Sequence, residues 1–521
     1  MLLYRYCNSN SPTSQLEVIT MTAPLVLGLS MLLAILMAVT ALYRLTLHPL
    51  AHIPGPKIAA VTQLYQTFYC YYGNKSRFYQ KIDHLHAKYG PVVRITPNEV
   101  SLNDPENYNK IYHVGTKYWK APDYYRVFGA PAAFFTTVEN RIHSLRRAPL
   151  NTFFSRKSVL NLEPVVQEKA RILIMRLQEG LNGGNNGRGV VELHDVFSAL
   201  SIDVASDYSF HSCYGLLGAE GYGHKFSSMV RGVLKSFWFF MQFETVENLA
   251  LQLPPWLSSA FSPALKRYNA MVEGTRRNVK AVKAQVDGGH DKPLRRSIFH
   301  ELLESEQPPS VDDMTDIALT IIVAAAAATG NALSIMAFYV INDPKVYQRL
   351  RSELIEAFPE DKPDMSWSAL EKLPYLAAVI KESLRLSYGV IGRLPRIVPE
   401  PGAEFNGYFI PPGSTVGMSS WTMHRSPSIF PEPDKFDPGR WLDPAESSRL
   451  QRYLVSFGKD SRQCIGMPLA YCELYVTAAA LFRAFGDLEI VDTQVSDLVF
   501  DDYFSGYHPE NATPLRVTRR K

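Results

Sequence analysis

The sequence predicts a mainly helical protein with minor β-sheets, built as one large domain behind an N-terminal membrane helix. With 521 residues, 46% of them hydrophobic, the chain can bury a large core. Most of the chain after residue 57 repeats its apolar residues at helical spacing. Short β-branched runs between turn residues occur at 91–104 and 403–420, and Asn406-Gly407 in the second run suits a tight hairpin. A mainly α fold with small sheets is therefore expected.

The N-terminal membrane helix is predicted from residues 23–43, which carry no charged side chain. At a rise of about 1.5 Å per residue, a stretch of this length crosses a hydrocarbon core of about 30 Å. A cleaved signal peptide is the alternative, but this apolar stretch is longer than the core of such a peptide and lacks a clear small-x-small exit. We therefore expect these residues to anchor the protein in a membrane.

The charges beside this helix predict its orientation. Arg44 and Lys57 follow it, whereas residues 1–22 carry a single basic side chain. The positive-inside tendency then makes residues 1–22 a short lumenal segment and places the large domain in the cytosol. The prolines of residues 44–56 predict an extended, stiff hinge. The large domain is expected to comprise residues 57–521.

Charge and cysteine content exclude several classes of protein. The formal charge of +4 comes from 54 basic and 50 acidic side chains without a long basic run, so no nucleic-acid partner is expected. The 5 cysteines are widely separated and include no Cys-x-x-Cys pair, which argues against a disulfide framework or a zinc site. A reducing compartment fits this pattern. The Gly- and Asn-rich residues 180–189 predict an exposed loop between helices.

One cysteine has distinctive surroundings. In SFGKDSRQCIGMPLAYCELY, residues 456–475, Cys464 follows Arg462 by two positions and precedes Gly466 by two. Phe457 opens the same segment, and an unbroken helical pattern follows it. This arrangement raises the question of what the cysteine does.

Three further segments carry paired charges. Glu382 and Arg385 stand one helical turn apart, where a carboxylate and a guanidinium can pair. Arg440 ends a proline-rich stretch and is placed to fork onto the same carboxylate. His143 and Arg147 stand four apart on one helical face, a cationic pair that suits an anion.

The order of these segments resembles the cytochrome P-450 superfamily of haem-thiolate proteins over nearly the whole chain. Four of the family's five fixed positions around the cysteine are matched, by Phe457, Arg462, Cys464 and Gly466. The segments run in the family's order: the anchor and hinge, the helix with His143 and Arg147, a long helix before Pro344, Glu382-x-x-Arg385, Phe436-x-Pro-x-Arg440-Trp441 and the cysteine segment. The resemblance implies the P-450 fold.

The resemblance also implies a haem b cofactor with Cys464 as its axial ligand, because a thiolate pushes electron density into the iron and favours cleavage of the bound O–O bond. Phe457 would shield this ligand from water, and Gly466 would let the following helix start close to the porphyrin. The haem propionates would be contacted by Arg462, Arg147, His143 and Arg396.

Two further assignments follow from the same resemblance. Glu382, Arg385 and Arg440 would form a structural triad that locks the haem-binding core, so they are scaffold rather than chemistry. For His143, an ordinary surface histidine is the alternative to a propionate contact.

Asp460 is one departure from the family, which has glycine at this position in the turn that aims amide hydrogens at the sulfur. Asp tolerates a left-handed backbone better than most residues, and Gly458 can absorb part of the bend. The loop is therefore expected to form. If the carboxylate points inward, its charge should lower the reduction potential of the iron.

The larger departure lies in residues 319–344, which correspond to the helix that crosses the oxygen face. Ala327 and Ala328 hold the family's acid and alcohol positions, and their methyl groups cannot relay the protons that oxygen activation requires. Thr329, the remaining candidate for a catalytic hydroxyl, lies about 100° further around an ideal helix and is expected to face elsewhere unless the helix is distorted. The alanines are also strong helix formers that would widen a groove for a bulky apolar substrate.

The resemblance implies a monooxygenase that hydroxylates, epoxidises or repeatedly oxidises a lipophilic small molecule, with a substrate hydroxyl or ordered water replacing the missing relay. Residues 143–164 are similar to fungal members of the trichodiene-oxygenase type, which implies a terpenoid or related secondary metabolite. The alanines leave open a haem-thiolate isomerase, dehydratase or peroxide-rearranging enzyme that needs no O₂ activation. A non-catalytic haem-binding protein is the third class.

The sequence contains no Gly-rich dinucleotide or flavin signature, so electrons from NADPH must arrive through a separate protein. The family implies the NADPH-cytochrome reductase flavoprotein, in the endoplasmic reticulum membrane. Lys459, Arg462 and Arg452 near the cysteine are placed to meet its acidic surface. A merely solvated basic patch is the alternative for Lys459 and Arg452.

Overall fold

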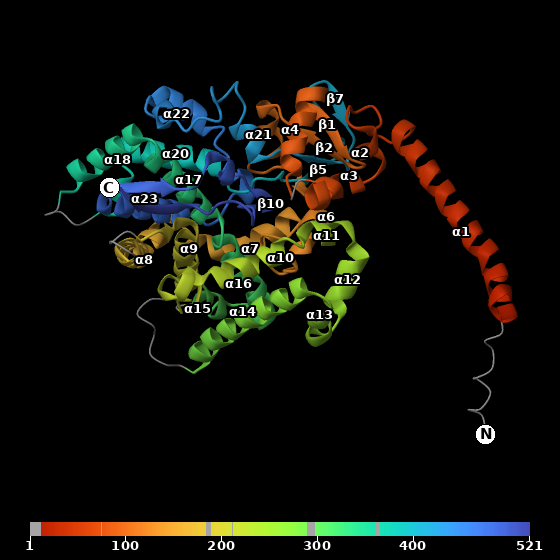
Figure 1. Ribbon diagram of the computed structural model, residues 1–521, viewed down its shortest axis with the longest axis horizontal. Coiled ribbons are helices and arrows are strands. Elements are labelled where there is room, and N and C mark those ends of the chain that lie inside the picture. Colours follow the sequence, from red (N-terminus) through yellow and green to blue (C-terminus); the bar gives the residue numbers. More distant parts are fainter. Residues whose placement is uncertain are drawn as a thin grey trace.

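The computed structural model describes residues 12–73, 76–183, 189–210, 212–288, 297–359 and 365–520. These residues form a body of packed helices with small sheets, and one long helix, α1 (Pro12–Thr46), projects away from it (Figure 1). The predicted fold class, mainly α with minor β-sheets, is confirmed.

Helices build most of the body. The longer ones are α4 (Phe78–Tyr89), α7 (Asn140–Phe153), α8 (Arg156–Asn182), α9 (Leu193–Phe210), α10 (His224–Leu234), α12 (Glu244–Gln252), α14 (Pro263–Asp287), α16 (Val311–Ala325), α17 (Ala328–Asn342), α18 (Pro344–Ala357), α20 (Pro374–Ser387), α22 (Pro444–Gln451) and α23 (Met467–Ala484). The shorter ones are α2 (Lys57–Val61), α3 (Leu64–Thr67), α5 (Tyr108–Ile111), α6 (Pro122–Tyr125), α11 (Phe237–Gln242), α13 (Pro255–Phe261), α15 (Ile298–Leu303), α19 (Trp367–Leu370) and α21 (Ser420–His424).

The largest sheet lies beside the base of α1 (Figure 1). Its strands run in the order β1 (Val92–Thr96), β2 (Glu99–Leu102), β8 (Thr415–Gly417), β5 (Arg396–Ile397) and β3 (Trp119–Lys120). Only β2 and β8 pair in parallel among these strands; the other neighbours are antiparallel. This sheet carries Arg396 on β5, and it therefore places one predicted site residue.

Smaller sheets complete the β structure. They are β4 (Val191–Glu192) with β12 (Arg516–Arg519) and β9 (Leu488–Val491), β10 (Asp501–Tyr503) with β11 (Ser505–Tyr507), and β6 (Ala403–Phe405) with β7 (Tyr408–Ile410). The last pair is the hairpin predicted at Asn406-Gly407, whose φ angles of 48° and 84° are both left-handed. Asn and Gly accept this backbone more readily than other residues, which is why they mark such turns.

The core forms where α17 packs against α9, α20 and α23. Helix α8 shows how the sequence builds it: Leu162, Val166, Leu173 and Leu177 recur at intervals that keep them on one face, and all are buried. That face packs against α9 and α23. The apolar stretch Val311–Asn342 is long enough to span a membrane, but it is 67% buried inside the protein, as a core helix pair should be.

The N-terminal region differs from the expected extended hinge. Helix α1 continues to Thr46, and the following residues form hydrogen-bonded turns rather than a stalk. Leu50 and Ile53 are buried, and the Arg94 guanidinium donates to the carbonyls of Arg44 and Leu50 at 2.9 and 3.3 Å. Because these contacts bury apolar area and satisfy backbone carbonyls, the segment packs onto β1 instead of standing away from it.

Two further predictions concern the chain's ends and loops. Residues Val26–Thr46 have a mean hydropathy of 2.3 and none of this span is buried, which is compatible with a membrane anchor. Residues 184–188 of the predicted glycine-rich loop lie outside the described residues.

Candidate active site

One cavity of about 390 Å³ brings together every residue that the sequence singles out for the site. Its lining includes Cys464, Phe457, Arg462 and Gly466 from the cysteine segment, His143 and Arg147 from α7, Arg396 from β5 and Thr329 from α17. These residues are far apart in the sequence, and the packing of α7, α17, β5 and the cysteine loop makes them neighbours.

The cysteine loop folds back on itself before α23. The amide of Cys464 donates to the carbonyl of Phe457 at 2.9 Å, and Gly458 and Asp460 provide the bend with φ angles of 67° and 72°. The predicted left-handed turn thus forms with Asp in the position of glycine. A Cβ placed on Gly466 would meet only the Cys464 sulfur, at 3.9 Å, so the space beside the loop is open.

The Cys464 side chain is exposed because it faces the cavity. Burial among the surrounding protein raises the pKa of its thiol, while the Gly466 amide and the Arg147 charge oppose the rise. The cysteine is therefore accessible from the cavity and is held by its loop in one position.

Basic side chains gather around the same cavity. Arg147 donates to the Gln463 carbonyl at 2.7 Å, and Arg462 donates to the Val138 carbonyl at 2.6 Å and to Asn140 Oδ1 at 2.8 Å. Arg396 donates to the Tyr125 hydroxyl at 3.2 Å. These bonds orient the arginines and still leave part of their donor capacity unused.

Three nitrogen atoms in this cluster are buried and lack a hydrogen-bond partner among the described residues: His143 Nδ1, Arg396 Nε and Arg462 Nε. Burial and the surrounding cations lower the pKa of His143 to about 3, and burial together with Arg396 lowers that of Arg462 to about 10. Unpaired buried donors are costly, and crowded cations are destabilising. Carboxylate groups of a ligand would relieve both.

Lys120 belongs to this cluster but is missed by the sequence analysis. It is buried, lines the cavity, and lies 4.1 Å from the centre of the Tyr125 ring and 4.3 Å from that of Phe135. Burial and the charges of Arg396 and Arg462 lower the pKa of its amino group well below the ordinary value. No local pattern separates Lys120 from Lys117, three residues earlier, so only the fold reveals it.

Glu473 on α23 is a second residue that sequence reasoning missed. It is 2% exposed, lines the cavity, and its Oε2 has no hydrogen-bond partner among the described residues. Burial raises the pKa of this carboxyl to about 8, opposed by a hydrogen bond with Ser201. A single acid inside an apolar helical run was the signal available in the sequence.

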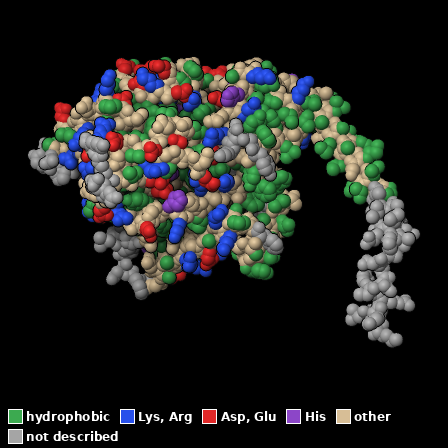
Figure 2. Space-filling view, viewed as in Figure 1, with side chains coloured by type: hydrophobic (Ala, Val, Ile, Leu, Met, Phe, Trp, Pro, Cys, Tyr) green, Lys and Arg blue, Asp and Glu red, His purple; other side chains and the backbone are tan. Residues whose placement is uncertain are grey.

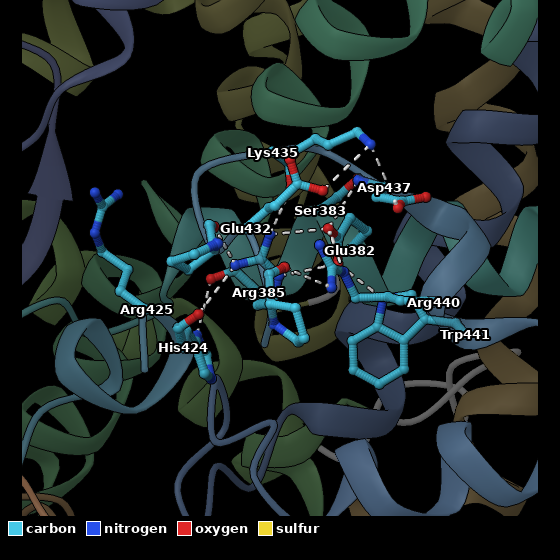
Figure 3. A network of polar contacts seen from close by, with 12 residues as sticks. Glu382, Ser383, Arg385, His424, Arg425, Glu432, Lys435, Asp437, Arg440 and Trp441 are labelled. Carbon is cyan, nitrogen blue, oxygen red and sulfur yellow. Dashed lines mark hydrogen bonds and ion pairs between the residues drawn. The ribbon is translucent and has the colours of Figure 1, made fainter. Parts of the chain in front are cut away.

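The predicted triad lies outside the cavity lining. The side chains of Glu382 and Arg385 are fully buried, and that of Arg440 is 8% exposed. Figure 3 shows the polar contacts that join them. Arg385 forks onto Glu382 with two hydrogen bonds of 3.0 and 2.8 Å, and Arg440 Nε donates to the same carboxylate at 3.0 Å. The Trp441 indole and the Asp437 amide add bonds of 2.8 and 2.9 Å. Glu382 is thereby a fully bonded buried anion.

This network is connected to the cysteine loop. Arg385 donates to the His424 carbonyl at 3.0 Å, and His424 Nε2 accepts from the Val455 amide at 2.8 Å. The next residue, Ser456, donates to the Leu384 carbonyl at 2.8 Å. Gly389 allows the close approach, because a Cβ there would lie 2.2 Å from the Ser456 carbonyl oxygen. The triad thus holds the start of the loop that carries Cys464.

The alanine run does not form the continuous helix that alanine propensity predicts. Helix α16 ends at Ala325 and α17 begins at Ala328, with Ala327 at φ −133° and ψ −46° between them. The Ala326 amide bonds to the Val323 carbonyl three residues back, so the helix tightens and then breaks.

The break changes which residues reach the cavity. Ala328 and Thr329 both line it, whereas Ala327 is 1% exposed and packs in the core. Thr329 is predicted to face elsewhere only if the helix is undistorted; the helix is broken here, and Thr329 lines the cavity. Thr329 thus lines the cavity one residue after the position expected for the alcohol.

The rest of the lining is mainly apolar. It is supplied by α10, α14, α16 and the segment before α7, and it includes Phe128, Phe135, Val230, Met271, Leu319 and Val323. Helix α14 packs against both α10 and α16, which closes this part of the cavity. The site thus joins a cysteine, a cationic cluster and an apolar chamber.

Comparison with known proteins identifies the family. The sequence model described as Cytochrome P450 matches residues 60–500. The cytochrome P450 monooxygenase tpcC of Cochliobolus heterostrophus is 35% identical over 91% of this chain and 93% of its own length. The tryptophan 6-hydroxylase fscE of Fusarium equiseti is 36% identical over 92% and 94%, and the conidiogenone synthase PchP450 of Penicillium rubens is 33% identical over 92% and 95%.

These relatives are fungal, and tpcC is named as a cytochrome P450 monooxygenase. The family carries haem on a cysteine thiolate and oxidises small molecules. With a family match over most of the chain and relatives aligned nearly end to end, this chain belongs to the cytochrome P450 family and is a cytochrome P450 monooxygenase.

Proposed function

We propose that this protein is a membrane-bound haem-thiolate monooxygenase that oxidises a lipophilic terpenoid or related fungal secondary metabolite. The observation that carries the proposal is the cavity itself, in which an accessible cysteine and a cationic cluster adjoin an apolar chamber. The named relatives include a tryptophan 6-hydroxylase and a conidiogenone synthase. Because these names differ so widely, the proposed substrate class rests on the apolar lining and on the resemblance of residues 143–164.

The residues around the cavity fit a haem. Cys464 would be the axial ligand, and the open space beside Gly466 would admit the porphyrin. The unpartnered nitrogens of His143, Arg396 and Arg462 are suited to the two haem carboxylates, and Arg147 adds a further charge. A haem bound on the thiolate supplies the iron that activates O₂.

The other residues that line the cavity would bind the substrate and deliver protons. The apolar side chains of α10, α14 and α16 exclude water and favour an apolar substrate in the chamber. Thr329 provides a hydroxyl in the cavity wall where Ala328 cannot. We propose that Thr329, with water or a substrate hydroxyl, takes over proton delivery, so an isomerase, dehydratase or peroxide-rearranging reaction is not needed to explain the alanines.

An apolar face beside the base of α1 supports membrane association. Figure 2 shows hydrophobic side chains gathered on this side of the body. Helix α11 packs against α3, so two segments distant in sequence share the face. Exposed apolar side chains on or next to α2, α3, α12 and α13 include Ile58, Leu64, Phe68, Phe243, Leu249 and Trp256. With α1 in the endoplasmic reticulum membrane, this face would rest on the bilayer surface with the domain in the cytosol.

The electron donor in this proposal is the NADPH-dependent reductase flavoprotein. Of the three basic residues expected to meet it, Arg462 is turned toward the cavity and toward the carbonyls of residues 137 and 138. The Lys459 amino group donates to the Arg452 carbonyl and to Asn109. Arg452 is therefore the residue best placed to contact an acidic partner surface.

Membranes that contain the full-length protein and the reductase test the proposal. With NADPH, O₂ and a panel of terpenoids, mass spectrometry should find products heavier by one oxygen or by successive oxidations. Product formed without NADPH and O₂ would instead support a rearrangement. In a carbonate wash the full-length chain should stay in the membrane pellet, and its extraction would contradict a spanning α1.

A further inference from the structure

Asp460 contributes a carboxylate to the cationic cluster of the cavity. Its side chain is 0% exposed, Oδ1 accepts the Arg462 amide, and Oδ2 lies 3.6 Å from Nη2 of Arg396. Oδ2 has no hydrogen-bond partner among the described residues. The carboxylate is therefore turned inward, toward the basic side chains.

Asp460 acts on the whole cluster. Its charge contributes to the electrostatic environment of Lys120, Arg147, Arg396 and Arg462. Burial raises the pKa of its carboxyl, and the Arg396 charge opposes this rise. In a buried setting such charges interact more strongly than they would in water.

The backbone reinforces this placement. Asp460 has a φ of 72°, a left-handed conformation that glycine adopts freely and that few other residues tolerate. A strained residue persists where the surroundings hold it, here through Arg396 and the Arg462 amide. Glycine would give the same turn without the charge.

We propose that Asp460 is a built-in carboxylate that shares Arg396 with the haem, and that it lowers the reduction potential of the iron and weakens the hold on the haem carboxylates. The inference rests on the proposed haem site. A fixed negative charge disfavours addition of an electron to a nearby metal, which lowers the potential. It also competes for the guanidinium that a haem carboxylate would bind.

Two substitutions separate the effect of the Asp460 charge from the effect of its backbone conformation. Asp460→Asn removes the charge and keeps a residue that tolerates the left-handed turn, and Asp460→Gly removes the charge and the strain. Both should shift the potential of the haem-loaded protein to more positive values by similar amounts. Both should also slow the transfer of haem to an excess of apo-globin several-fold.

The control is Asp434→Asn, which removes a carboxylate that is 70% exposed and pairs with Arg425. Solvent screening should leave the potential unchanged in this variant. A shift in Asp460→Gly without one in Asp460→Asn would show a backbone effect and overturn the proposal, as would unchanged potentials in both.

The carbon monoxide difference spectrum of the wild type is recorded first. If it is not of the thiolate type, the proposed function fails and this inference falls with it. If the spectrum is of the thiolate type but the potentials do not move, only the role of Asp460 is overturned.

Discussion

Two buried arginine clusters in this domain differ in what completes them. Around Glu382, every donor of Arg385 has a protein partner, and Arg440 and Trp441 complete the carboxylate. Around the cavity, Arg396 and Arg462 each keep a buried nitrogen without a partner among the described residues. The protein's own groups satisfy the first cluster, whereas the second keeps donors that the proposed haem carboxylates would bind. That difference separates scaffold from site.

The scaffold cluster should give the largest effect on stability. Glu382→Gln removes the charge between two buried guanidinium groups, so we expect the free energy of unfolding to fall by about 3 to 5 kcal/mol. Denaturant unfolding of the variant measures this loss.

Glu446→Gln is the matched control, because Glu446 also pairs with an arginine three residues later, at 2.6 Å, but on the surface. This substitution should leave unfolding nearly unchanged. Equal unfolding midpoints for Glu382→Gln and the wild type would contradict a structural role for the triad.

The cavity cluster should affect haem retention more than folding. Arg147→Gln removes a charge from the cavity lining, and losing one charge-assisted hydrogen bond should speed haem loss by about tenfold. Arg146→Gln is the control. Arg146 is the sequence neighbour of Arg147, but it donates to Thr137 Oγ1 and the Pro131 carbonyl and does not line the cavity. Similar haem loss in both variants would show that Arg147 does not hold the cofactor.

The pH dependence of the apoprotein distinguishes the clusters further. The pKa of His143 is about 3 in the folded protein against an ordinary 6.5, so the unfolded chain binds a proton that the folded chain excludes. Stability should therefore be lost as pH falls from about 6.5 toward 3, and His143→Gln should lose less. Haem carboxylates would favour protonated His143, so bound haem should reduce the loss of stability that the wild type suffers at low pH. If the wild type and His143→Gln have the same urea midpoint at each pH in this range, His143 does not contribute to the cationic cluster.

The smallest expected effect concerns proton delivery. Thr329→Val should lower product formed per NADPH and raise peroxide, while the substrate-binding spectrum stays unchanged, because the hydroxyl is lost and the shape is kept. Ala328→Thr should raise coupling if the added atoms fit, since overpacking costs about 1 to 3 kcal/mol.

Ala327→Glu tests whether an acid at position 327 can deliver protons to the cavity. Because Ala327 packs in the core and does not line the cavity, a glutamate there should destabilise the fold without improving coupling. If Thr329→Val couples as well as the wild type, water or substrate alone delivers the protons.

Local patterns predicted the features that depend on near neighbours in the sequence. The spacing around Cys464 and the pair Glu382 and Arg385 lie within single segments, and the hairpin at Asn406-Gly407 follows from the turn preferences of two residues. The resemblance then connected the distant segments, and the structure brings their residues to one cavity.

Features that depend on tertiary packing were not predicted. Lys120 and Glu473 become site residues only because remote elements fold around them. The break at Ala327 occurs despite the strong helix propensity of alanine. The hinge packs onto β1 because Leu50 and Ile53 are buried in the core there. Each of these outcomes depends on tertiary contacts, which local propensity does not describe.

The central claim, that Cys464 holds a haem iron in this cavity, is tested most directly by the carbon monoxide difference spectrum of the reduced protein. The wild type and Cys472→Ala, which replaces a buried cysteine on α23, should both give the thiolate-type spectrum. Cys464→Ala should lose it. A thiolate-type spectrum that persists in Cys464→Ala would contradict the account.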